Sequence, residues 1–408
     1  MQRGDRDKVA RRRVFYIPGY DPFHPRRYRE LYRSEAKAQS EISGYEVVLG
    51  PKRPGHAHGW QVTGRMEDGE TQAEIEVLVW SDIVRSSMAE GIAATYGQLL
   101  KTAWIYVASG VIFRVMQLRK GPTIAALYPV VVLLLQLLIA AAAGWGAALL
   151  LGRGLAAAGL PGGFGWIGAA LLVWAILWRF RALDGRIYAY YLMHDYAFTA
   201  QEGGAYPAVL EARLAQFTDR VVAALQEDWD EVLVVGHSSG AHLAVSVLAD
   251  LIRSGRVPAS GPALGFLSLG HVVPMAAFLP CARRLRADLA FLSARDELAW
   301  VDVTAPGDGC SFALCDPVSV TGVAPPNKRW PLVISAAFTQ TLSPERWQAL
   351  KRRYFRLHFQ YLCAFDRPGD YDYFRITAGP KTLAARFRDR KPSQSRIERV
   401  ANRYRDIE

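Results

Sequence analysis

Short apolar runs separated by polar turns occupy the first part of the chain. We expect strands at residues 14–17, 45–49, 60–66 and 71–80. The last two flank Glu-Asp-Gly-Glu at residues 67–70, which is typical of a hairpin turn. A basic segment at residues 26–40 has the pattern of a helix.

The alternation of apolar runs and amphipathic segments returns after residue 206. An amphipathic pattern predicts a helix at residues 207–225. We expect further strands at residues 232–235, 263–269, 299–303 and 354–357. Strands that alternate with helices predict an α/β fold with a mostly parallel sheet flanked by helices.

The middle of the chain has a different pattern. No charged residue lies between Lys120 and Arg153, and a second uncharged stretch lies between Arg153 and Arg179. A helix needs about 20 apolar residues to cross the hydrocarbon core of a bilayer. We therefore predict a transmembrane hairpin, inserted into the α/β domain, with the Gly-rich residues 152–161 between its two helices. Two buried core helices are the alternative, but soluble cores rarely need apolar runs of this length.

A third apolar segment, residues 102–113, is too short to span and is expected to be an interfacial or buried helix. Two spans return the chain to the same side of the bilayer, so the flanking parts can build one domain. The expected organisation is an N-terminal part, an amphipathic interfacial helix, the hairpin, a C-terminal part and a basic tail, at residues 1–82, 83–120, 121–181, 182–380 and 381–408. We expect this tail to be a solvated helix.

Composition and charge narrow the class of protein. Hydrophobic residues make up 51% of the 408 residues, which excludes a disordered chain, and the four cysteines are too few for a disulfide-stapled domain. The formal net charge of +11 favours an anionic partner. The chain has no recognised nucleic-acid-binding motif, so we expect no nucleic acid partner and favour the lipid bilayer.

Basic residues also predict the orientation in the membrane. Arg114, Arg119 and Lys120 precede the first span and Arg179 and Arg181 follow the second, whereas the loop between the spans holds only Arg153. By the positive-inside rule, both large segments face the cytoplasm. The N-terminal stretch lacks an apolar run with a cleavage site, so we expect no secretory signal peptide.

The motif with the clearest chemistry is Gly-His-Ser-Ser-Gly at residues 236–240. It follows an apolar strand and precedes an amphipathic helix, and the two glycines allow strand and helix to approach closely. A sharp turn there strains the serine and lifts its hydroxyl above the sheet. This stretch resembles the nucleophile elbow of the α/β-hydrolase superfamily, which implies that Ser238 is a nucleophile. The alternative is an ordinary Gly/Ser turn.

The resemblance extends to the first strand. Phe-Tyr-Ile-Pro-Gly-Tyr-Asp at residues 15–21 looks like the early strand and oxyanion loop of that superfamily, where many members have His-Gly in place of Pro-Gly. It implies that the backbone N–H groups of Tyr20 and Ser239 bind the oxyanion, with Gly19 beside the substrate.

The superfamily places its acid after a later strand. Asp302 lies inside the strand expected at 299–303, whereas Asp308 lies in the loop beyond it. The resemblance therefore implies Asp308 as the acid, with Asp316 as the next candidate. A carboxylate that only stabilises an Asx turn before Gly309 is the alternative.

The histidine follows the acid in that superfamily. His358 is the only histidine after Asp308, so the resemblance implies it as the base, at the end of a possible strand. His271 follows the strand beside the serine turn and is the rival base. His271, His24 and His237 are also expected to contact substrate.

Together these features predict a membrane-anchored serine hydrolase that cleaves an ester or thioester of a lipid or acylated amphiphile. The reaction that the resemblance implies requires no metal and no organic cofactor. A membrane-anchored scaffold that has the hydrolase fold but no activity is the alternative. The sequence leaves the oligomeric state open.

Overall fold

A computed structural model describes residues 7–52, 58–88 and 91–407. Its centre is an eight-stranded sheet in the order β2-β3-β4-β1-β5-β6-β7-β8. The strands are β1 (Arg11–Ile17), β2 (Glu46–Lys52), β3 (Gly59–Met66), β4 (Gly69–Val77), β5 (Glu231–His237), β6 (Ala263–Leu269), β7 (Ala299–Thr304) and β8 (Leu332–Ser335). The prediction of an α/β fold is confirmed.

The sheet is mostly parallel. β4, β1, β5, β6, β7 and β8 pair in parallel, whereas β2, β3 and β4 pair antiparallel through the predicted hairpin. Strands from both sides of the apolar hairpin are neighbours, because β1 pairs with β5. The two parts of the chain therefore build one sheet, as the sequence predicts.

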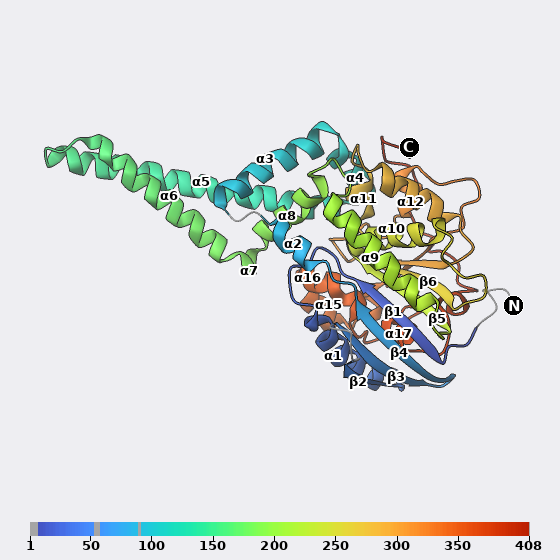
Figure 1. Cartoon of the computed structure of the whole chain (residues 1–408). Helices are drawn as coiled ribbons and strands as arrows, with labels where there is room; N and C mark the ends of the chain where they lie inside the picture. Colours follow the sequence, from blue (N-terminus) through green and yellow to red (C-terminus); the bar gives the residue numbers. More distant parts are fainter. Residues whose placement is uncertain (1–6, 53–57, 89–90, 408) are drawn as a thin grey trace.

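Helices cover both faces of the sheet, because successive strand residues point to opposite sides. Val232 and Val234 of β5 pack into one apolar cluster with α9 (Ala208–Leu225), α10 (Gly240–Arg253) and α12 (Arg283–Ser293). Leu233 and Val235 pack into a second cluster with α1 (Arg26–Ser43) and α17 (Tyr373–Thr377). Figure 1 shows α9 and α10 on one side of the strands and α1 on the other. Burial of β5 on both faces is why its sequence is a continuous apolar run.

The inserted segment forms two long antiparallel helices, α5 (Lys120–Ala157) and α6 (Gly165–Ala182), joined near η2 (Gly162–Phe164). They project together away from the rest of the molecule (Figure 1). Both helices are long and apolar enough to cross a membrane. Large apolar side chains on their outer surfaces are exposed, among them Val131, Leu138, Leu150, Leu171 and Trp174.

The segment expected as one interfacial helix is broken in two. α3 (Ile92–Ala108) and α4 (Val111–Leu118) meet at an angle of 70°. Gly110 lies at the break with φ +73°, a left-handed conformation that glycine adopts without the steric penalty of a side chain. The prediction of a continuous helix over 102–113 is therefore wrong.

The remaining helices connect these parts. They are α2 (Ser81–Ser87), α7 (Asp184–Ile187), α8 (Ala189–Ala200), α11 (Val273–Ala277), α13 (Pro317–Thr321), α14 (Phe338–Thr341), α15 (Pro344–Leu350), α16 (Tyr354–His358), η3 (Phe359–Leu362) and α18 (Leu383–Arg386). Residues 354–357 are thus helical and not the last strand, which is β8. A segment as short as Tyr-Phe-Arg-Leu does not distinguish a strand from a helical turn, and packing decides between them.

The basic tail also differs from the prediction of a solvated helix. Within the described residues after 380, only Leu383–Arg386 is helical. The rest lies along the domain, where backbone N–H groups of Ser393, Ile397 and Ala401 donate to Val333, Leu314 and Val320. These hydrogen bonds satisfy the backbone without a helix, and Pro392 disfavours one locally.

Candidate active site

Ser238 lies at the turn between β5 and α10, which we call the serine turn (residues 236–240). Its φ is +58°, the left-handed region that costs a non-glycine residue about 1–3 kcal/mol. A Cβ placed on Gly240 would lie 2.1 Å from the carbonyl oxygen of Ile17, so the turn requires glycine there. The sharp strand-to-helix turn predicted from the sequence is present.

The loop after β1 lies directly against the serine. A Cβ placed on Gly19 would lie 2.9 Å from Cβ of Ser238 and 3.3 Å from its Oγ. The neighbouring Tyr20 N–H donates a hydrogen bond of 2.9 Å to Oγ of Ser239. This amide points toward the serine turn, as the resemblance implies, but it must exchange that hydrogen bond before it can bind an oxyanion.

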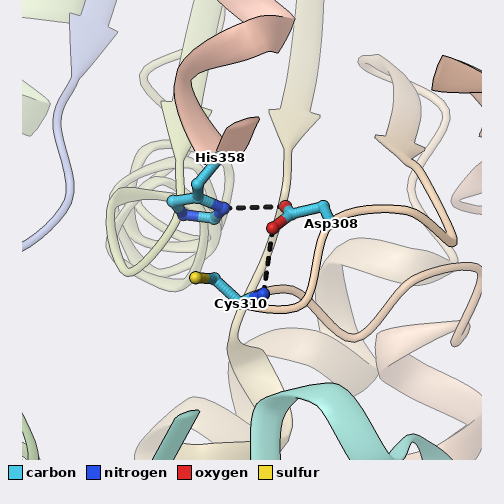
Figure 2. Close-up of side chains that lie close together, drawn as sticks. All are labelled: Asp308, Cys310 and His358. Carbon is cyan, nitrogen blue, oxygen red and sulfur yellow. Dashed lines mark hydrogen bonds and ion pairs between the residues drawn. The ribbon is translucent and has the colours of Figure 1, made fainter. Parts of the chain in front are cut away.

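Asp308 and His358 form a buried pair. Nδ1 of His358 lies 2.7 Å from Oδ2 of Asp308, and Figure 2 shows the two side chains pointing toward each other. Asp308 belongs to the acid loop (residues 305–316) that follows β7, and His358 ends α16. The Cys310 N–H and the Tyr361 hydroxyl also donate to this carboxylate, at 2.9 Å and 3.0 Å.

The electrostatics of this pair favour an ionised acid. Burial alone would raise the pKa of Asp308, but the charge of His358 and the hydrogen bonds to the carboxylate outweigh burial and hold the pKa below its usual value. The carboxylate therefore accepts the Nδ1–H of His358 and fixes the ring orientation. This arrangement leaves Nε2 as the nitrogen that can accept a proton.

His237 connects the serine turn to His358. Its Nε2–H donates to the His358 carbonyl oxygen at 3.0 Å, and its Nδ1 lies 3.3 Å from the Tyr16 hydroxyl. Burial lowers the pKa of His237 to about 3, so the ring is neutral. Both ring nitrogens thus have partners, which makes His237 a positioning residue as well as part of the cavity wall.

One cavity of about 700 Å³ brings these groups together. Its lining includes Gly19, Tyr20, His237, Ser238, Ser239 and His358. Within the described residues, no hydrogen bond joins Oγ of Ser238 to His358. Hydrogen bonds of this kind are often long or poorly aligned without substrate and form only in the complex.

The rival acids have other partners. Asp302 is fully buried inside β7 and accepts a 2.5 Å hydrogen bond from Ser268. Asp316 caps α13 and lies 2.7 Å from the Lys328 ammonium. Neither lines the cavity.

The other histidines expected at the site lie outside it. His271 is fully buried, and its Nε2–H donates to the Cys315 carbonyl oxygen at 2.9 Å. Burial lowers the pKa of His271 to about 4. His24 is exposed, with its ring 5.6 Å from that of His58. Neither His271 nor His24 lines the cavity, so the structure does not bring them together with Ser238 there.

Asp308, Cys310 and His358 are also close enough together to ligate a metal ion (Figure 2). Two of these ligand atoms, however, are already hydrogen bonded to each other, because Nδ1 of His358 donates to Oδ2 of Asp308. Burial raises the pKa of Cys310, which keeps the thiol protonated, whereas a metal ligand must be a thiolate. The donor set therefore fits the acid–histidine pair better than a metal site.

Sequence reasoning missed one wall of the cavity. It is built by the first turns of α5 and by α7 and α8, which contribute Pro122, Ile124, Tyr128, Arg186, Tyr191 and Asp195. Burial raises the pKa of Asp195 to about 7, close to physiological pH. Periodicity carries no signal for this wall, because its residues reach the site only through the packing of the inserted helices.

No protein-family model matches the chain, and comparisons with curated proteins and with solved structures give no significant match.

Proposed function

We propose that the protein is a membrane-anchored serine hydrolase that cleaves an ester or thioester bond in a lipid or acylated amphiphile. We assign the fold to the α/β-hydrolase superfamily on the order of its parts: an oxyanion loop, a serine turn, an acid loop and a histidine. The observation that carries the proposal is the strained Ser238 in the same cavity as the Asp308–His358 pair.

The mechanism follows from the roles of these groups. Oγ of Ser238 attacks the carbonyl carbon while its proton moves to Nε2 of His358, and Asp308 stabilises the imidazolium. The negative oxygen is held by the backbone N–H groups of Tyr20 and Ser239. The proton on His358 then passes to the leaving alcohol or thiol as its bond to the carbonyl carbon breaks. Water, activated by the same histidine, releases the acid and restores Ser238.

The position of the cavity supports a membrane substrate. Helices α5 and α6 have the length and composition of spans, and the start of α5 lines the cavity. Beside them, α3 and α4 expose a row of large apolar side chains suited to the bilayer interface: Leu100, Trp104, Val107, Phe113 and Met116. Basic residues flank both spans on the side of the domain, among them Arg119, Lys120 and Arg181, so by the positive-inside rule we propose that the domain faces the cytoplasm.

A scaffold without activity is the second candidate. The observation that favours it is that Ser238 and His358 are not hydrogen bonded to each other in the described part of the chain. A scaffold needs no reactive serine, so covalent labelling separates the two candidates.

The test is reaction of the full-length protein in membranes with a fluorophosphonate, which phosphonylates activated serines. We expect labelling that is lost in Ser238→Ala and kept in Ser254→Ala, an exposed serine just after α10 that serves as the control. Wild-type protein that is folded and unlabelled would support the scaffold.

A further inference from the structure

The cavity begins where the inserted hairpin leaves the domain. A Cβ on Gly121, in the first turn of α5, would lie 2.9 Å from the carbonyl oxygen of Gly309 in the acid loop. Further along α5, the Tyr128 hydroxyl donates a hydrogen bond of 2.7 Å to the carbonyl oxygen of Ile187. Ile187 lies where α7 ends and the turn to α8 begins. The start of α5 and this turn therefore frame one side of the cavity.

α5 is longer than a membrane span requires. Its 38 residues extend about 57 Å at 1.5 Å per residue, whereas about 20 residues cross the hydrocarbon core. The far part of the helix packs on α6, through contacts such as Gly144 with Val173 and Gly152 with Gly165. The near part, with Pro122, Ile124, Ala125 and Tyr128, lines the cavity. A single helix thus runs from the cavity wall into the hairpin.

Four arginines gather on the cavity lining: Arg186, Arg352, Arg353 and Arg356. All four are exposed, and none has a carboxylate partner within the described residues. Arg186 comes four residues after the end of α6, so it lies close to where the hairpin meets the domain. The rings of Phe355 and Tyr188, 4.7 Å apart, hold the segment with the other three arginines against the α7–α8 turn.

The carboxylates of the lining do not neutralise this cluster. Asp21 already pairs with Arg27 at 2.8 Å and accepts a hydrogen bond from Tyr28. Asp195, with its pKa raised to about 7 by burial, is only partly ionised at neutral pH. The rim therefore carries net positive charge beside an apolar wall, an arrangement complementary to an amphiphile with an anionic headgroup.

We propose that the cavity takes an anionic membrane lipid directly from the bilayer, with its headgroup on Arg186, Arg352, Arg353 and Arg356 and its acyl chain along the near part of α5. The scissile carbonyl then lies at Ser238. This inference rests on the proposed serine hydrolase and specifies its substrate class. The occupant is a lipid in the membrane, because the apolar wall continues into a helix suited to the bilayer.

The test measures occupancy of the cavity rather than turnover of one chosen lipid. Full-length protein is reconstituted in vesicles of phosphatidylglycerol or of phosphatidylcholine with identical acyl chains. The readout is the rate at which a neutral, water-soluble fluorophosphonate labels Ser238. An anionic lipid in the cavity protects Ser238, so we expect labelling to be at least about fivefold slower in phosphatidylglycerol, since several cations act on one anionic headgroup.

Two charge variants identify the cause of the difference, expressed as the labelling rate in phosphatidylcholine divided by the rate in phosphatidylglycerol. In the triple variant Arg352→Gln, Arg353→Gln and Arg356→Gln, the ratio between the two lipids should fall toward one. The matched control, Arg33→Gln, Lys37→Gln and Arg65→Gln, removes the same charge outside the cavity lining and should keep the wild-type ratio.

The outcomes separate the two proposals. Labelled wild-type protein with equal rates in both lipids overturns the anionic-lipid assignment and leaves the hydrolase standing. The anionic-lipid assignment is also overturned if the triple variant of Arg352, Arg353 and Arg356 keeps the wild-type ratio of labelling rates. The same holds if the control variant loses that ratio. Folded wild-type protein that is labelled in neither lipid nor in detergent overturns the hydrolase and this inference with it.

Discussion

Gly121 of α5 packs directly on Gly309, the residue that follows Asp308, the acid of the proposed mechanism. A Cβ on Gly121 would lie 2.9 Å from the Gly309 carbonyl oxygen and 3.0 Å from its Cα. Nearby, the Arg119 guanidinium donates to the Ala313 carbonyl oxygen at 2.7 Å, in the same acid loop. The base of the hairpin therefore supports the loop that orients His358, which would couple the inserted helices to the proposed reaction.

The first prediction tests this coupling. In Gly121→Ala, the added methyl group must displace the acid loop, so we expect at least about tenfold slower labelling of Ser238, since small misplacements in an active site are costly. Gly146→Ala is the control, because it lies in the same helix and a Cβ there meets nothing within 4 Å. Equal labelling rates in the two variants would show that the contact has no functional consequence.

A second prediction concerns the acid–histidine pair. In Asp308→Asn, the side chain no longer holds the Nδ1–H tautomer of His358, so ester hydrolysis should fall roughly 10³–10⁴-fold. In His358→Ala, the rate of ester hydrolysis should fall by at least the same factor. Asp316→Asn, the control, lies outside the cavity and should retain hydrolysis within about tenfold of wild type. If His271→Ala lost activity while His358→Ala stayed active, the base would be His271 and the proposed role of His358 would be wrong.

A third prediction concerns stability at acidic pH. Burial lowers the pKa of His271 to about 4, whereas an unfolded histidine has a pKa near 6.5. The unfolded chain therefore binds more protons between these values, so this contribution to stability is present above pH 6.5 and is lost as the pH falls. Between pH 7 and pH 5 it amounts to about 2 kcal/mol for such a histidine.

Thermal unfolding in detergent at both pH values measures this effect. His271→Gln should lose less stability than wild type on acidification, and the exposed His24→Gln should behave as wild type. Burial also lowers the pKa values of His237 and His242 to about 3, which adds to the loss, whereas the raised pKa of Asp195, about 7, opposes it. The difference between wild type and His271→Gln therefore isolates the contribution of His271. Equal losses of stability in wild type and in His271→Gln between pH 7 and pH 5 would contradict this prediction.

A fourth prediction concerns orientation. In Ala157→Cys, a cysteine is introduced at the end of α5, which the proposed topology puts on the side of the bilayer away from the domain. An impermeant maleimide added to intact cells should modify it. The native Cys281 is exposed on the domain and should react only after the membrane is permeabilised. Modification of Cys281 in intact cells would reverse the proposed topology.

How far the sequence predicts this molecule depends on the range of the interactions involved. The serine turn is a local feature, because Gly236, Gly240 and the flanking apolar runs are contiguous, and the predicted turn is present. The hairpin is also local, since the long uncharged runs specify it. The chain order of the resembled superfamily implies His358 as the base, and His358 does lie beside Asp308, although on a helix and not on a strand.

The remaining features depend on contacts between distant segments. The tail of the chain is extended because it bonds to Val333, Leu314 and Val320, which no local pattern reveals. His271 and His358 are both buried and have the same chemistry in sequence, and only the packing of the fold places His358 on the cavity lining and His271 away from it. The wall formed by α5, α7 and α8 arises where the inserted helices fold back on the acid loop.

The central claim is that Ser238 forms a covalent intermediate. The most direct measurement is peptide mapping by mass spectrometry after brief reaction of the full-length protein with an activated acyl ester, in wild type and in His358→Ala. We expect one acyl group per chain on the peptide that contains residues 236–240 of wild type, and none on that peptide in the variant. An acyl group found only on other residues, or equally in wild type and variant, would contradict a serine nucleophile activated by His358.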